Sequence, residues 1–99
     1  MSGWACEFDA VLWESRTAAD GTAWVFLTVP PEETEEIRLR SGPPRGFGSV
    51  RVEVTVGGST WRTSVFPDSR GYALPVKKAV RRAELLDAGD RARVRLRLL

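Results

Sequence analysis

Histidine is absent from the 99 residues of this chain, and cysteine occurs once, at Cys6. The lack of histidine excludes Ser-His-Asp and Cys-His catalysis and removes the commonest general base. Zinc sites built from cysteine and histidine are excluded too, and a single thiol forms no internal disulfide. We therefore expect no metal and no cofactor, and we expect Cys6 to pack as a small apolar side chain on a strand.

Long apolar runs are also missing. No stretch approaches the ~18 apolar residues that a membrane-spanning helix needs. The first seven residues have neither the basic start nor the apolar centre of a secretory signal. The sequence thus indicates a cytoplasmic protein with no membrane partner, and its length suits one domain over residues 1–99.

The chain does have the alternation of apolar and polar residues that is typical of strands. Residues 50–56 and 59–67 alternate on either side of Gly57-Gly58, which permits the positive backbone angles of a tight hairpin turn. Further strands are predicted at residues 5–14, 23–29 and 72–74. In a last strand the inward residues are Ala92, Val94, Leu96 and Leu98, and the outward ones are Arg91, Arg93, Arg95 and Arg97.

Two short helices are predicted, at residues 31–39 and 75–84. The first has Pro31 and glutamates near its start, where the helix dipole favours negative charge. The second has one apolar stripe, and Leu85-Leu86 is expected to pack after it; the stripe is Val76, Ala79, Val80 and Ala83. A strand, proline, helix, turn and strand occur twice, with Pro30 and Pro75 in matching places, which predicts two half-barrels related by a pseudo-two-fold axis.

Charge is distributed unevenly along the chain. Residues 1–41 carry a net charge of −5, residues 42–74 carry +2 and residues 75–99 carry +5. One interpretation is that acidic and basic elements lie side by side, with Glu7 and Asp9 across from the arginines of the last strand. The other is a basic face for an anionic partner, on which the four arginines follow phosphates.

Three segments carry a resemblance to a known family: residues 45–52, residues 57–67, and residues 71–77 continuing to Gly89-Asp90. Together they resemble a bacterial and archaeal family of domains of unknown function, DUF1905. Its members often precede a bacteriocin-protection domain of the YdeI/OmpD-associated kind. The resemblance implies an all-β fold with two short capping helices, a double-split β-barrel like that of AbrB-type transcription factors. It implies no activity.

A polar cluster is the candidate site. It consists of Arg45, Ser49, Arg51, Trp61, Arg62, Ser64 and Lys77. We expect Arg62, Ser64 and Lys77 to hold an anionic ligand, with a free backbone amide where the second helix starts. In the alternative, Arg62 packs its stem over Trp13 or Trp61 and pairs with a surface acid.

Three functions remain open from the sequence. The first is a non-catalytic module that binds a small anionic molecule or a protein partner. The second is a nucleic-acid-binding domain that uses the basic C-terminal helix and strand. The third is an enzyme without histidine that uses Arg62, Ser64 and Lys77 with a carboxylate such as Glu53.

Overall fold

The structure is a computed structural model that describes residues 4–15, 24–41 and 48–99. The predicted loops at residues 15–21 and 41–46 lie almost entirely outside the described residues, and Arg45 lies there too. The described part contains nine elements: β1 (Ala5–Val11), β2 (Trp13–Ser15), β3 (Trp24–Thr28), α1 (Pro31–Arg40), β4 (Val50–Val56), β5 (Ser59–Asp68), β6 (Gly71–Pro75), α2 (Lys78–Glu84) and β7 (Arg91–Leu98).

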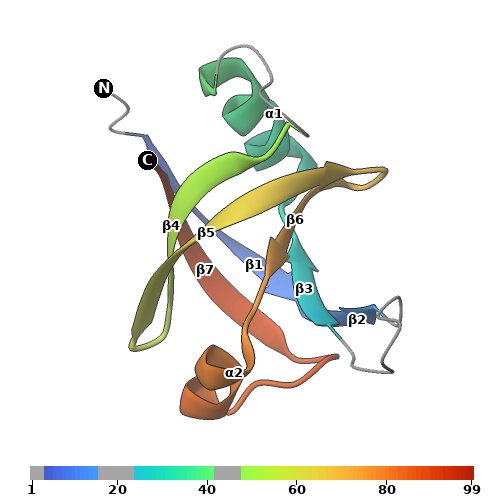
Figure 1. The fold of residues 1–99 in the computed structure, drawn as a ribbon, viewed down its shortest axis with the longest axis vertical. Coiled ribbons are helices and arrows are strands. Elements are labelled where there is room, and N and C mark those ends of the chain that lie inside the picture. The colour runs from blue at the N-terminus through green and yellow to red at the C-terminus, as the bar shows by residue number, and fades with distance from the viewer. Residues whose placement is uncertain (1–3, 16–23, 42–47) are drawn as a thin grey trace.

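The strands form one antiparallel sheet in the order β1-β7-β4-β5-β6-β3-β2. The sheet curls into a half-barrel, and α1 and α2 lie at its opposite ends (Figure 1). The prediction of an all-β fold with two short helices is therefore confirmed.

The first predicted strand is interrupted at Leu12. The backbone N–H of Leu12 donates to the Asp90 carbonyl at 2.9 Å, and its carbonyl accepts from the Gly89 N–H at 2.8 Å. On one side of this break β1 pairs with β7, and on the other β2 pairs with β3. The prediction of one continuous strand over residues 5–14 was wrong, because the chain changes partners at Leu12. This buried residue joins the two edge strands of the curled sheet.

The internal repeat has a counterpart in the pairing. β3, α1 and β4 follow one another in the first half, and β6, α2 and β7 do so in the second. Equivalent strands pair with each other, since β3 pairs with β6 and β4 pairs with β7. The two halves thus contribute matching strands to one sheet.

The core lies inside the curl and follows the predicted alternation. From Val52 onward in β4, and throughout β7, every second residue is buried, namely Val52, Val54, Val56, Ala92, Val94, Leu96 and Leu98. The hairpin between β4 and β5 is also confirmed. Val56 pairs with Ser59, and Gly57 adopts a φ of +58°.

The helix α1 agrees with its prediction and is one residue longer. Ile37 is its buried apolar residue, and the Thr34 hydroxyl donates to the Val29 carbonyl at 3.0 Å. On the exposed side Glu35 pairs with Arg38 and Glu36 pairs with Arg40.

The helix α2 is shorter than predicted, because it begins at Lys78. The Val76 N–H donates to the Val25 carbonyl at 2.9 Å, which keeps residues 75–77 extended beside β3. Val80 is buried as expected, but the other stripe residues in the helix, Ala79 and Ala83, are exposed. Leu85 does not pack. It adopts the left-handed conformation that ends the helix and lies exposed, whereas Leu86 packs against the core. Neither helix in the described part of the chain is long and apolar enough to span a membrane.

Candidate anion-binding cleft

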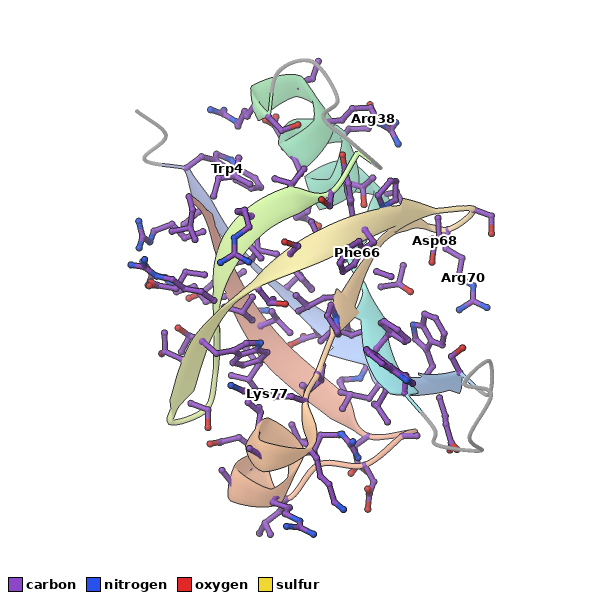
Figure 2. The ribbon with its side chains drawn as sticks, in the orientation of Figure 1. Trp4, Arg38, Phe66, Asp68, Arg70 and Lys77 are labelled. Carbon is purple, nitrogen blue, oxygen red and sulfur yellow. The ribbon has the colours of Figure 1, made fainter. Side chains whose placement is uncertain are left out.

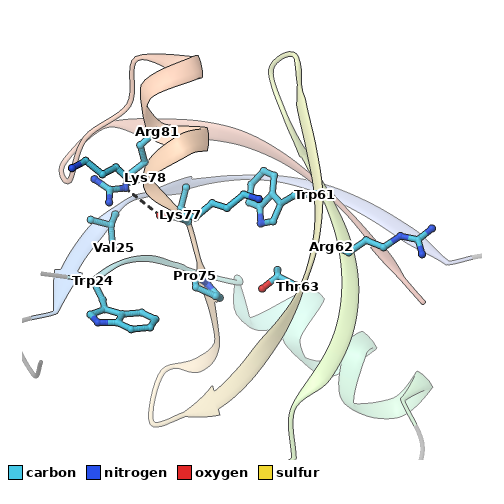
Figure 3. A pocket seen from close by; sticks show the side chains of 10 residues that line it. Trp24, Val25, Trp61, Arg62, Thr63, Pro75, Lys77, Lys78 and Arg81 are labelled. Atoms are coloured by element: carbon cyan, nitrogen blue, oxygen red, sulfur yellow. Dashed lines mark hydrogen bonds between the residues drawn. The ribbon is translucent and has the colours of Figure 1, made fainter. Parts of the chain in front are cut away.

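A cleft opens where β5 and β6 separate. Within the described residues, β5 pairs with β6 only from Phe66↔Ala73 to Asp68↔Gly71, whereas it pairs with β4 over residues 59–65. A cavity of about 380 Å³ occupies the gap between them, bounded also by β3 and the start of α2 (Figure 3). Its lining residues are Trp24, Val25, Trp61, Arg62, Thr63, Pro75, Val76, Lys77, Lys78 and Arg81.

The charged residues of this lining are all cations: Arg62, Lys77, Lys78 and Arg81. Lys77 and Lys78 are exposed and form no ion pair with any residue that the structure describes. Arg81 donates through Nε to the Val76 carbonyl at 3.1 Å, which orients its guanidinium without neutralising it. Among the residues that the structure describes, the lining of the cleft is therefore positive and contains no carboxylate.

Aromatic and aliphatic side chains form the rest of the wall. Trp61 is only 8% exposed, whereas Trp24 is 55% exposed at the other side of the cleft. Pro75 lies between them (Figure 3). A ligand in this cleft would contact apolar surface and cations together, as ligands do in typical small-molecule sites.

The structure brings three of the predicted site residues to the cleft: Trp61, Arg62 and Lys77. Ser64 lies elsewhere, with its hydroxyl 3.5 Å from Nη1 of Arg51 on β4. Ser49 is exposed just before β4 and does not line the cavity. The predicted meeting of Arg62, Ser64 and Lys77 therefore does not occur.

The alternation of β5 explains this separation. Trp61 and Thr63 face the cleft, whereas the side chain of Arg62 leaves the strand on the opposite side (Figure 3). Lys77 was predicted in the first turn of a helix, but it precedes α2 as its N-cap, with extended backbone (φ −68°, ψ 156°). Its side chain extends toward Trp61 (Figure 3).

Arg62 has the surface acid that the alternative interpretation required. Its Nε lies 3.4 Å from Oε2 of Glu53, and Nη2 of Arg97 lies 3.0 Å from Oε1 of the same carboxylate. The hydrogen bond from Arg97, helped by Arg62, holds the pKa of Glu53 below its usual value. Arg62 is thus shared between the rim of the cleft and an ion-pair network on the outer face of the sheet.

The arginines of β7 lie beside acids, as one interpretation of the charge pattern expected. Arg93 contacts Glu7 at 3.3 Å and Asp9 at 3.5 Å, and Arg95 lies 4.0 Å from Glu7. The antiparallel register of β1 and β7 makes these contacts, because it places Glu7 opposite Arg95 and Asp9 opposite Arg93. Much of the positive charge of this strand is therefore compensated on its own face.

Cys6 packs against the core as a half-buried side chain. Burial, with a smaller contribution from Glu33, raises the pKa of its thiol to about 11. Across residues 4–15, 24–41 and 48–99, no group of three His, Cys, Asp or Glu side chains is placed to hold a metal ion.

Sequence reasoning missed several lining residues, among them Trp24, Lys78 and Arg81. Trp24 belongs to an almost wholly apolar strand, in which the two faces cannot be told apart by polarity. Lys78 and Arg81 were considered from the sequence only as part of the basic helix in the nucleic-acid alternative. The signal that was available is Pro75, because a proline cannot donate a ladder hydrogen bond and so favours an end of pairing there.

A small, curled antiparallel sheet with a basic cleft at the divergence of two strands defines this molecule as a β-barrel-like domain with a candidate ligand site. Residues 8–96 match the family described as "Domain of unknown function (DUF1905)". The chain belongs to this family, as the resemblance of its three segments indicated. No curated protein matches the chain.

Proposed function

We propose that this protein is a non-catalytic binding module that holds a small anionic molecule in the cleft between β5, β6 and α2. One observation carries the proposal: among the described residues the charged side chains that line the cavity are all cations, and Lys77, Lys78 and Arg81 lie beside its apolar wall without an acidic partner. An anion there would gain charge-assisted hydrogen bonds from Lys77 and Lys78.

The surroundings of these cations favour binding over simple screening by salt. Trp61 and Val76 are buried and lower the local dielectric on one side of the cleft. Because Lys77 and Lys78 have no carboxylate partner in the described part of the chain, a ligand would not have to displace one. Both features strengthen the attraction of a small anion relative to an ordinary surface lysine.

The two other functions have less support. An enzyme that uses Arg62, Ser64 and Lys77 needs these groups at one reaction centre. The hydroxyl of Ser64 instead accepts a hydrogen bond from Arg51 outside the cleft. The phosphates of a nucleic acid along β7 would have to displace the carboxylates of Glu7, Asp9 and Glu53 from the arginines of this strand. We therefore retain the binding module.

We also infer that the half-barrel is a double-split barrel of the AbrB type and that the protein acts in the cytoplasm. The pairing of β3 with β6 and of β4 with β7 supports the first inference. The single thiol, which has no internal partner for a disulfide, supports the second.

A thermal-shift panel tests the proposed function. The protein is melted with inorganic phosphate, sugar phosphates, nucleotides, amino acids and a short DNA duplex, at low and at physiological salt. A ligand of the folded state raises the melting temperature by mass action. We expect a small anion to raise it at both salt concentrations, and we expect Lys77→Met and Lys78→Met to remove the shift.

Arg82→Met is the matched control, because Arg82 is an exposed cation of α2 that does not line the cavity. It should leave the shift unchanged. A shift with the DNA duplex alone, lost at physiological salt, would overturn the proposal in favour of nonspecific electrostatic binding. The absence of a shift with every compound would also overturn it.

A further inference from the structure

We propose that the ligand of the cleft is an organic phosphate with a planar aromatic ring, whose ring stacks on Trp24 while its phosphate lies against Lys77 and Lys78. This inference rests on the proposed function and specifies the class of ligand. It comes from an arrangement of rings on the outer face of β2 and β3 that the anion site alone does not require.

The rings are those of Trp13, Phe26 and Trp24. Trp13 and Phe26 are cross-strand partners with ring centroids 5.1 Å apart and planes 29° apart. The ring centroids of Phe26 and Trp24 are 6.3 Å apart, and their planes are 15° apart. The guanidinium of Arg70 lies over Trp13 at 4.4 Å, and the Trp13 indole N–H donates to the Thr28 hydroxyl at 2.9 Å. The orientation of these rings is therefore fixed by their neighbours.

Trp24 is the member of this series that lines the cleft, and it is the most exposed tryptophan in the described part of the chain. Tryptophan is enriched at binding surfaces, because its ring offers a large apolar face beside a polar N–H. Phe26 holds the Trp24 ring nearly parallel to its own, so the indole is already oriented before binding. Stacking of a ligand ring would therefore cost little conformational entropy of the Trp24 side chain.

The charge of the cleft favours a phosphate over a carboxylate. Lys77, Lys78 and Arg81 have no acidic partner in the described residues, and Arg62 shares Glu53 with Arg97. A phosphate monoester carries about −1.5 to −2 at neutral pH and offers three acceptor oxygens, so it matches several cations better than one carboxylate does.

The positions of the two subsites agree with a single ligand. Trp24 lies at one side of the cleft, and Lys77 reaches across it toward Trp61, with Pro75 between them (Figure 3). Pro75 pairs with Phe26 across the β3–β6 ladder, so the apolar surface continues from the stacked rings to the cations. A ring and a phosphate joined by a short linker would span this surface.

Isothermal titration with AMP, ribose 5-phosphate and adenosine, and with oligodeoxyadenylates of increasing length, tests the inference. We expect AMP to bind about five- to hundredfold more tightly than ribose 5-phosphate, the gain that stacking on an aromatic side chain provides. Trp24→Leu should lower the affinity for AMP to that for ribose 5-phosphate. It should leave the affinity for ribose 5-phosphate unchanged. Trp24→Phe should restore part of the difference.

Phe66→Leu is the matched control. Phe66 is 44% exposed on β5 near the turn to β6, apart from Lys77 (Figure 2), and it does not line the cavity. Replacement of Phe66 should change neither the affinity for AMP nor the affinity for ribose 5-phosphate.

Equal affinities for AMP and ribose 5-phosphate, unchanged in Trp24→Leu, would overturn the stacking inference and leave the anion site standing. Adenosine that binds as tightly as AMP would overturn the role of the phosphate. If no compound binds, the proposed function fails together with the inference. Affinity that rises with length in oligodeoxyadenylates would overturn the small-molecule form in favour of single-stranded nucleic acid.

Discussion

Glu84, the last residue of α2, accepts a 2.7 Å hydrogen bond from the hydroxyl of Ser59, the first residue of β5. Its other carboxylate oxygen accepts from the Gly58 N–H at 3.2 Å. A Cβ at Gly57 would displace this carboxylate, and the positive φ of Gly57 favours glycine there. Through Glu84 the helix that carries Lys78 and Arg81 is fixed against the strand that carries Trp61.

Loss of the Glu84 carboxylate should destabilise the protein. We expect Glu84→Ala to lower the free energy of unfolding by about 1–2 kcal/mol, since hydrogen bonds to a partly buried carboxylate are worth more than neutral ones. Urea denaturation followed by circular dichroism measures this. Glu35→Ala is the control, because it removes only an exposed pair with Arg38 and should cost under about 0.5 kcal/mol. Equal costs for the two variants would contradict a structural role for Glu84.

Leu12 should be a sensitive core position despite lying outside any strand. It is 1% exposed, so Leu12→Ala should cost about 2–5 kcal/mol from lost burial and a residual cavity. Leu39, which is 76% exposed on α1, provides the comparison, and Leu39→Ala should stay within about 0.5 kcal/mol of the parent protein. A Leu12→Ala variant as stable as Leu39→Ala would show that the Leu12 side chain is not buried in the core.

Glu53 should contribute to acid sensitivity. Its pKa is lowered in the folded state by Arg97 and Arg62, so its stabilising effect is fully present above the unfolded value near 4.5 and is lost as pH falls through the folded value. In melting curves from pH 7 to pH 3, Glu53→Gln should be less stable than the parent at pH 7, and the difference should narrow as the pH falls. Glu32→Gln, which removes a carboxylate with no ion pair among the described residues, should show no such convergence. A constant difference for Glu53→Gln at all pH values would refute the assignment.

Cys6 should react slowly with alkylating agents. Its pKa of about 11, against an ordinary 9.0, leaves a thiolate fraction at pH 8 that is lower by about two orders of magnitude. Iodoacetamide labelling followed by mass spectrometry should therefore be at least about tenfold slower in the folded protein than in 6 M guanidinium chloride. Similar rates in the two states would show that the thiol is neither buried nor raised in pKa.

The regular part of the fold was predictable because strand alternation has a period of two and one face is buried. Val52, Val54, Val94 and Leu96 could be assigned to the core for that reason. The break at Leu12 was not predictable, because the residues on both sides continue the same alternation. The start of α2 was also missed, since Pro75 suits a first helical turn, and only the hydrogen bond between Val76 and Val25 keeps this segment extended.

The site was less predictable than the fold. Trp61, Arg62 and Lys77 were named from their residue types, and the structure brings them to one cleft. Trp24 and Arg81 reach the same cleft only because residues 59–65 of β5 do not pair with β6. Pro75 indicates that strand pairing ends near it, but which side chains the divergence brings together depends on how the whole sheet curls.

The central claim is that a small anion binds between β5, β6 and α2. The most direct measurement is a titration of the ¹⁵N-labelled protein with ribose 5-phosphate, followed by amide shifts in two-dimensional NMR. The account predicts saturable shifts that cluster at residues 61–63, 76–78 and 81. Shifts confined to residues 91–97, or none at millimolar ligand, would contradict it.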